Sequence, residues 1–153
     1  MAIANLHESI QSHILRRNQL NLEISNLQTQ KSLAVYSQGD LQCLFSSEKN
    51  AVRDYFKDLF ETDETYCEYL DYTEIPDYVE EIDKITARYE EEMERLTAYE
   101  TAIDTQITTD STELEEIKAY VESYKSMLTT SIPEDFNFGL NPYLGGQAAQ
   151  YVR

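Results

Sequence analysis

The chain has 153 residues, with 29 acidic and 12 basic side chains and a formal net charge of −17 at pH 7. This charge excludes electrostatic coating of nucleic acid, which needs clustered Lys and Arg, and disfavours adhesion to an anionic lipid surface. Because 41% of the residues are apolar and 11% aromatic, the chain is too hydrophobic for a disordered acidic segment. We therefore expect one small folded domain.

Residues that break helices are scarce. The chain has four Gly and three Pro, and Gly39 is the only glycine before residue 139. Sheet proteins need frequent turns, which draw on Gly, Pro, Asn and Asp. The composition therefore predicts an all-α fold.

The first predicted helix covers about residues 3–36. From Ile3 to Ala34, residues at alternating spacings of three and four form a heptad pattern that is mostly apolar. We expect this helix to end at a turn over residues 37–40, with Gly39 as the C-terminal cap. A short second helix is predicted over 47–61, where a wide apolar stripe follows a serine cap.

An acidic linker is predicted over 62–75. Residues 58–83 hold eleven acids and no Lys or Arg, with tyrosines between them. One interpretation is a solvated surface on a helical connector, the usual role of a charge run. The other is a docking surface for a basic partner, with Tyr66, Tyr69 and Tyr72 as its anchors.

The strongest pattern is a long helix over 76–130. Pro76 suits the first turn of a helix, and heptad positions a and d stay in phase from Val79 to Ser131. A Thr-rich patch at 105–112 is a poor helix former, so a hairpin bending near Asp110 is the alternative. We favour one helix, because two helices joined by a turn have no reason to share a register.

The predicted fold is all-α, an elongated antiparallel helical hairpin or coiled coil in a domain of residues 1–131. The polar residues in its two seams, which we expect to set the register, are Arg17, Lys31, Glu100 and Asp110. An irregular tail is predicted over 132–153, because Pro and Gly recur there. We expect it to fold back or to bind a partner through Phe136, Phe138, Leu140 and Tyr143.

Nothing in the sequence predicts catalysis, a cofactor or a metal site. The two histidines, His7 and His13, are six residues apart and point to different helix faces, and no Gly-rich loop precedes residue 139. Cys43 and Cys67 have neither a zinc-site spacing nor a disulfide framework, so we expect buried structural thiols. The N-terminus has no continuous apolar segment of a signal peptide, and no stretch is apolar enough to span a membrane. We expect a cytoplasmic protein, or one exported without a cleaved signal.

The first helix is too short to cover the long one, so the remaining seam must pack against the second helix, the tail, a second copy or another protein. We therefore expect a non-enzymatic structural or adaptor protein that acts through coiled-coil association with itself or a partner. One alternative is an acidic helical chaperone that shields a client, and another is a nucleic-acid mimic that inhibits a DNA-binding protein. In being small, acidic and rich in heptads, the chain resembles the export chaperones and stalk proteins of bacterial flagellar and type III secretion systems.

Overall fold

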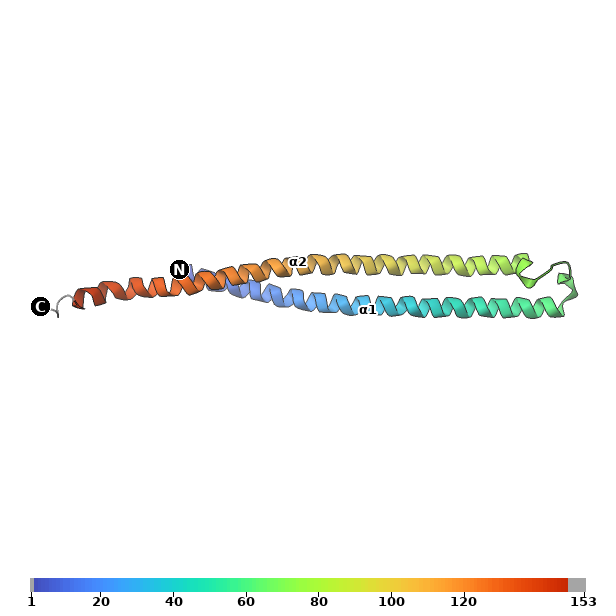
Figure 1. The fold of residues 1–153 in the computed structure, drawn as a ribbon, viewed down its shortest axis with the longest axis horizontal. Helices are drawn as coiled ribbons and strands as arrows, with labels where there is room; N and C mark the ends of the chain where they lie inside the picture. The colour runs from blue at the N-terminus through green and yellow to red at the C-terminus, as the bar shows by residue number, and fades with distance from the viewer. Residues whose placement is uncertain (1, 149–153) are drawn as a thin grey trace. The chain divides into compact units, whose positions relative to one another are not determined.

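The protein is a hairpin of two long helices joined by a short linker (Figure 1). The computed structural model describes the backbone of residues 2–148 and the side chains of residues 3–132. Helix α1 spans Ala2–Thr62 and helix α2 spans Pro76–Ala148, and between them lie two short 3-10 helices, η1 (Glu64–Tyr66) and η2 (Tyr72–Glu74). The long helices pack against each other, and residues 2–148 contain no strand. The predicted all-α hairpin is confirmed.

Helix α1 continues through the turn predicted at 37–40, so the separate helix over 47–61 was wrong. A glycine inside a helix costs about 1 kcal/mol relative to alanine, and packing offsets that cost here. The heptad spacing runs on past Gly39 without a change of phase. Its next five members are all half-buried: Gln38, Leu41, Phe45, Glu48 and Val52.

The linker contains two short helical turns, each with an acidic side chain as its cap. The side chain of Asp63 accepts a hydrogen bond from the backbone N–H of Thr65, and that of Asp71 accepts one from Tyr72. These carboxylates satisfy amides at the starts of the turns. Ile75, which is 1% exposed, anchors the end of the linker, and α2 begins at Pro76 as predicted.

Helix α2 is continuous through residues 108–112, so the single helix that we favoured is confirmed there. Its heptad a and d residues from Ile82 to Ser131 are all buried or half-buried, while Val79 is 44% exposed. The hydroxyls of Thr105 and Thr112 each donate to the carbonyl four residues earlier at 2.9 Å. The Thr-rich patch therefore forms helix with hydroxyls that bond to their own backbone.

The irregular tail predicted from residue 132 was wrong as far as Ala148, because α2 includes it. Pro133 and Pro142 each remove a backbone donor, but extending an existing helix needs no new nucleation. No glycine in the described part of the chain has a positive φ. The side chains predicted to dock there lie outside the described residues: Phe136, Phe138, Leu140 and Tyr143.

The chain divides into two compact units, each built from segments of both helices. One unit holds residues 1–26 and 107–153, and in its core Leu20 packs with Leu114, Ile117 and Val121. The other unit holds residues 27–106, where the ring of Phe45 stacks on Tyr89 with centroids 4.1 Å apart. Its buried apolar side chains are Ala34, Phe56, Ile75, Ile85 and Ile103.

Two further expectations concern exposure and membranes. Cys43 and Cys67 are both exposed, so the predicted burial of these thiols was wrong. Cys43 lies on the side of α1 that faces away from α2, and Cys67 lies in the linker. None of the described helices has the length and apolar character needed to cross a membrane.

Candidate functional site

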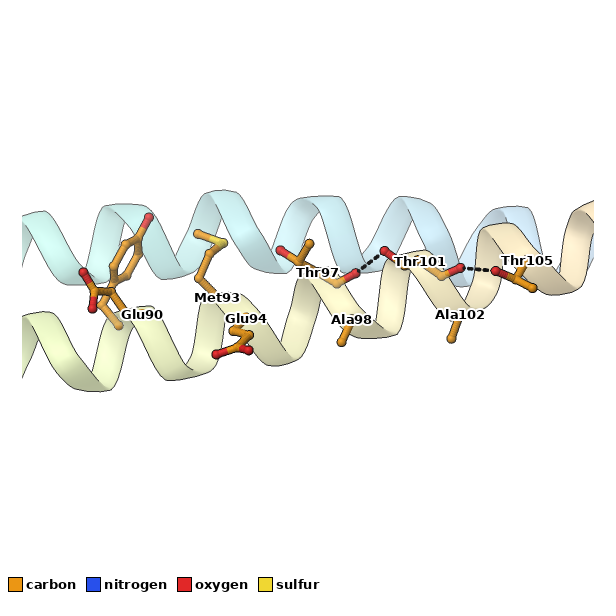
Figure 2. Close-up of a pocket in the computed structure, with 9 residues that line it drawn as sticks. Glu90, Met93, Glu94, Thr97, Ala98, Thr101, Ala102 and Thr105 are labelled. Atoms are coloured by element: carbon orange, nitrogen blue, oxygen red, sulfur yellow. Dashed lines mark hydrogen bonds between the residues drawn. The ribbon is translucent and has the colours of Figure 1, made fainter.

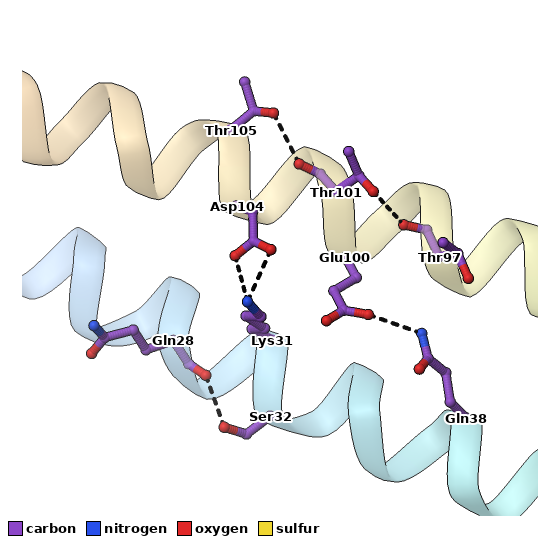
Figure 3. Close-up of polar contacts among 9 residues, drawn as sticks. All are labelled: Gln28, Lys31, Ser32, Gln38, Thr97, Glu100, Thr101, Asp104 and Thr105. Carbon is purple, nitrogen blue, oxygen red and sulfur yellow. Dashed lines mark hydrogen bonds and ion pairs between the residues drawn. The ribbon is translucent and has the colours of Figure 1, made fainter.

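Two of the predicted register residues cross the seam of the unit formed by residues 27–106 (Figure 3). The Lys31 ammonium lies 2.7 and 2.9 Å from the two carboxylate oxygens of Asp104. The pKa of Lys31 is raised above its ordinary value, mainly by the hydrogen bond to Asp104. Desolvation of the ammonium opposes this shift. Gln38 Nε2 donates to Glu100 Oε2 at 3.1 Å. The sequence reasoning missed Gln38, which the continued heptad spacing identifies, and Asp104, which follows the seam residue Ile103.

In the other unit, Arg16 makes the interhelical ion pair, one residue before the predicted Arg17. Its guanidinium donates two hydrogen bonds to the Glu113 carboxylate, at 2.7 and 2.8 Å. The pair raises the pKa of Arg16 and lowers that of Glu113. Both residues occupy heptad position g, which flanks the seam and commonly carries interhelical ion pairs. Arg17 is half-buried beside Glu115 and Glu122, where it lines a hollow of about 420 Å³.

Asp110 and His13 are structural residues of this same unit. Asp110 is only 4% exposed, and its charge contributes to the raised pKa of Arg16. The His13 ring lies edge-on to the rings of Tyr120 and Tyr124, with centroids 5.7 and 5.4 Å away. Its Nδ1 atom is 2.7 Å from the carbonyl oxygen of Ser9. Packing and local hydrogen bonding account for His13.

The tyrosines predicted as partner anchors are half-buried within the linker. The rings of Tyr66 and Tyr69 lie 6.5 Å apart, and Tyr72 packs edge-on against Tyr78 at 5.5 Å. Tyr78 in turn packs on Phe56 near the end of α1, at 5.6 Å. The exposed apolar residue of this region is Leu70, whose side chain is 90% exposed. A single leucine between acidic residues belongs to no heptad pattern, so the sequence gives no sign that it is exposed.

Large apolar side chains remain exposed on α1, although α2 already covers its seam. They lie at heptad positions that point away from the seam or flank it. None of them is buried in the core. Their exposed fractions are 65% for Leu15, 64% for Leu22, 61% for Leu33, 73% for Tyr36 and 55% for Leu44. Such side chains are where another helix finds an apolar contact.

The two flanks of the unit formed by residues 27–106 differ in charge on α2, and α1 partly offsets this difference. We define the b/e flank and the c/g flank by the heptad positions that lie on either side of the seam. On α2 the b/e flank of residues 79–106 carries five acids and no base: Glu80, Asp83, Glu90, Glu94 and Asp104. The c/g flank balances two acids with two bases: Glu81, Glu92, Arg88 and Arg95. On α1, Lys49 and Arg53 lie on the b/e side, and Asp40 and Asp58 lie on the c/g side.

Each flank also has a shallow hollow. On the b/e side, a groove of about 700 Å³ follows α2 from Tyr89 to Thr105 (Figure 2). The hydroxyl of Thr101 donates to the carbonyl of Thr97, and that of Thr105 to the carbonyl of Thr101, so these side chains are less polar than the sequence suggests. On the c/g side, a hollow of about 340 Å³ is lined by Leu41, Leu44, Phe45, Glu48, Ile85, Arg88, Tyr89 and Glu92.

No group of three or more His, Cys, Asp or Glu side chains in the described part of the chain is arranged to hold a metal ion. Comparison of the chain with protein-family models, curated proteins and solved structures gave no match.

Proposed function

We propose that the protein is a non-enzymatic structural or adaptor protein that acts through coiled-coil association with itself or a partner. The observation that carries this proposal is the exposure of Leu33, Tyr36 and Leu44, at 61%, 73% and 55%, on a helix whose seam is already filled. Exposed apolar patches on folded proteins mark interaction sites more often than isolated exposed residues do. A hairpin that closes its own seam has no internal use for these side chains.

The test is association by the purified full chain and by a double variant, Leu33→Ser with Leu44→Ser. Light scattering and capture from the source organism's extract are performed at low and at high salt. Apolar helix contacts are not screened by salt, so we expect an association that survives high salt and is lost in the double variant. An intact chain that stays monomeric and retains the same proteins as the double variant contradicts the proposal.

A second candidate, an acidic chaperone that shields a basic client, is favoured by Leu70. This side chain is 90% exposed within a stretch of eleven acids and no bases. An apolar anchor surrounded by carboxylates suits a cationic amphipathic segment, because the charges steer the encounter and the leucine is buried on binding. We expect a cationic amphipathic peptide to bind in a salt-sensitive manner, and Leu70→Ser to weaken it. Equal binding by Leu70→Ser and the intact chain removes this candidate.

A further inference from the structure

The c/g flank of the unit formed by residues 27–106 is suited to another protein surface of the same kind. It exposes Leu33 and Leu44 on α1 and Tyr99, 48% exposed, on α2. Between Ser32 and Ser47 the only charged residue of α1 is Asp40, which occupies position c and is exposed. Opposite residues 30–51 of α1, the charges on this flank are balanced, with Asp40 and Glu92 against Arg88 and Arg95. In a chain with a net charge of −17, this central stretch is where a second acidic chain meets little repulsion.

The contacts between α1 and α2 give the level of each residue along this unit. Gln38 lies opposite Glu100, and Phe45 opposite Tyr89. Because the helices are antiparallel, Asp40 on α1 is level with Arg95 on α2. Lys31 lies opposite Asp104, so two residues further along each antiparallel helix Leu33 is level with Ala102. Acid and base, and large and small side chains, therefore occur at matching levels of the two helices on one flank.

We propose that two copies of this chain pack through their c/g flanks as a four-helix bundle, with a two-fold axis parallel to the helices. The inference rests on the proposed function, since it names the partner as a second copy. The two-fold axis lays α1 of each copy along α2 of the other at the same level. Asp40 of one copy then meets Arg95 of the other, and Leu33 meets Ala102 of the other. Both contacts occur twice, as a two-fold interface requires.

The hollow on this flank provides a third contact. It is lined by Leu41, Ile85 and Tyr89 among others, and the Glu48–Arg88 ion pair lies at its edge. Leu44 itself lines the α1 side of this hollow, so Leu44 of the second copy, at the same level, projects toward its α2 side. Arg95 is 65% exposed and is held only by Glu91 and Glu92 of its own helix, at 3.4 and 3.0 Å. Its guanidinium therefore has donors left for an acid of the second copy.

The size of the flank fits a stable dimer. Residues 30–51 of α1 extend about 33 Å at 1.5 Å per residue, and two helices side by side are about 20 Å wide. This gives roughly 1,300 Å² for both copies together, within the range of about 1,200–2,000 Å² for specific interfaces. Over the same stretch the b/e flank is less balanced, because Glu90, Glu94 and Asp104 of α2 lie there with Lys49 of α1 as the one base. In the proposed bundle the two acidic linkers meet at one end, so salt should strengthen the dimer by screening their repulsion.

The test uses sedimentation equilibrium of the full chain at several salt concentrations, with Asp40→Arg, Arg95→Asp and the double variant that exchanges the two charges. Each single variant places like charges opposite each other and should weaken dimerisation at least about tenfold, whereas the double variant should recover it. The matched control is Glu94→Arg, which makes the same change of charge as Asp40→Arg next to Arg95 but on the b/e flank. It should leave dimerisation within about threefold of the intact chain, and circular dichroism should show that all variants keep their helix.

A dimer of the intact chain with this pattern of loss and recovery supports the inference. If the intact chain is monomeric at all accessible concentrations, the inference is overturned. The proposed function still stands in that case if the chain binds a different protein and the double variant Leu33→Ser with Leu44→Ser does not. A dimer that responds equally to Asp40→Arg and Glu94→Arg, or is not recovered by the charge exchange, overturns the assigned flank while self-association remains.

Discussion

Among the described side chains of the unit formed by residues 1–26 and 107–153, Leu20 is the most completely buried, so its truncation tests the packing there. It is 0% exposed and contacts Leu114, Ile117 and Val121 of α2. Leu20→Ala removes three carbons, worth about 2.4 kcal/mol at about 0.8 kcal/mol per buried CH₂ group. The cavity adds to this loss, but two helices can close around a small gap. We therefore expect a decrease of about 2.5–3.5 kcal/mol in the free energy of unfolding.

The matched control is Leu22→Ala, the same substitution two residues away at a side chain that is 64% exposed. It should change the free energy of unfolding by no more than about 0.5 kcal/mol. Urea unfolding followed by circular dichroism gives both values at one fixed protein concentration, which keeps any contribution of self-association constant. If the two variants lose the same stability, or if Leu22→Ala loses more, the heptad assignment of α1 is wrong.

Three further predictions concern the linker, the glycine in α1 and the ion pair. Ile75→Ala should lower the free energy of unfolding by about 2–4 kcal/mol in urea, because the side chain is 1% exposed where the linker meets α2. Gly39→Ala should raise it by about 1 kcal/mol, since Gly39 is helical and a Cβ there meets no atom within 4 Å; a loss of stability would contradict the continuous α1. Arg16 lowers the pKa of Glu113, so the pair stabilises the fold fully above the carboxyl's unfolded pKa, and this stabilisation is lost as the pH falls through the lower folded pKa. Thermal unfolding measured from neutral to acidic pH should give melting temperatures of the intact chain and of Glu113→Gln that converge at low pH. A difference in melting temperature that stays constant with pH would show that the pair is absent.

The long-range pattern of the sequence was enough to predict α2 from Pro76 to about residue 130. An unbroken heptad phase from Val79 to Ser131 is a property of many residues, and the local weakness at 105–112 was small beside it. The hydroxyls of Thr105 and Thr112, which donate to their own helix, show why that weakness did not break the helix. Pro76 marked the start of α2 correctly, because it acts locally through its fixed φ, whereas the serine cap predicted before residue 47 lies inside α1.

The two errors in helix ends have a common cause, which is that local stop signals were given more weight than an ongoing helix. Gly39 costs about 1 kcal/mol inside a helix, less than the packing of the seam residues that follow it. The segment from 132 to 148 contains Pro and Gly, and α2 nevertheless includes it. A stop signal ends a helix only where the apolar pattern also ends, and at Gly39 the pattern continued with Gln38, Leu41 and Phe45.

The candidate site was less predictable than the fold. Lys31 and Glu100 were found as polar residues in apolar seams, but their partners Asp104 and Gln38 depend on how the two helices are aligned, which one helix pattern does not determine. The linker tyrosines were recognised by composition, yet composition does not distinguish packed rings from exposed ones, and the exposed residue is Leu70. The charge difference between the two flanks of α2 depends on the side of the seam on which each residue lies, which a count of charges along the chain does not show.

The central claim is that α1 and α2 of one chain pack antiparallel in a single alignment, and a zero-length crosslink tests it most directly. A carbodiimide joins an amine to a carboxylate only when they touch, as Lys31 and Asp104 do at 2.7 Å. A mixture of isotope-labelled and unlabelled chains then shows by mass spectrometry whether the linked peptides came from one chain. We predict a Lys31–Asp104 link found only between peptides of the same label. A link found mainly between different labels, or Lys31 joined to other acids and not to Asp104, would contradict the claim.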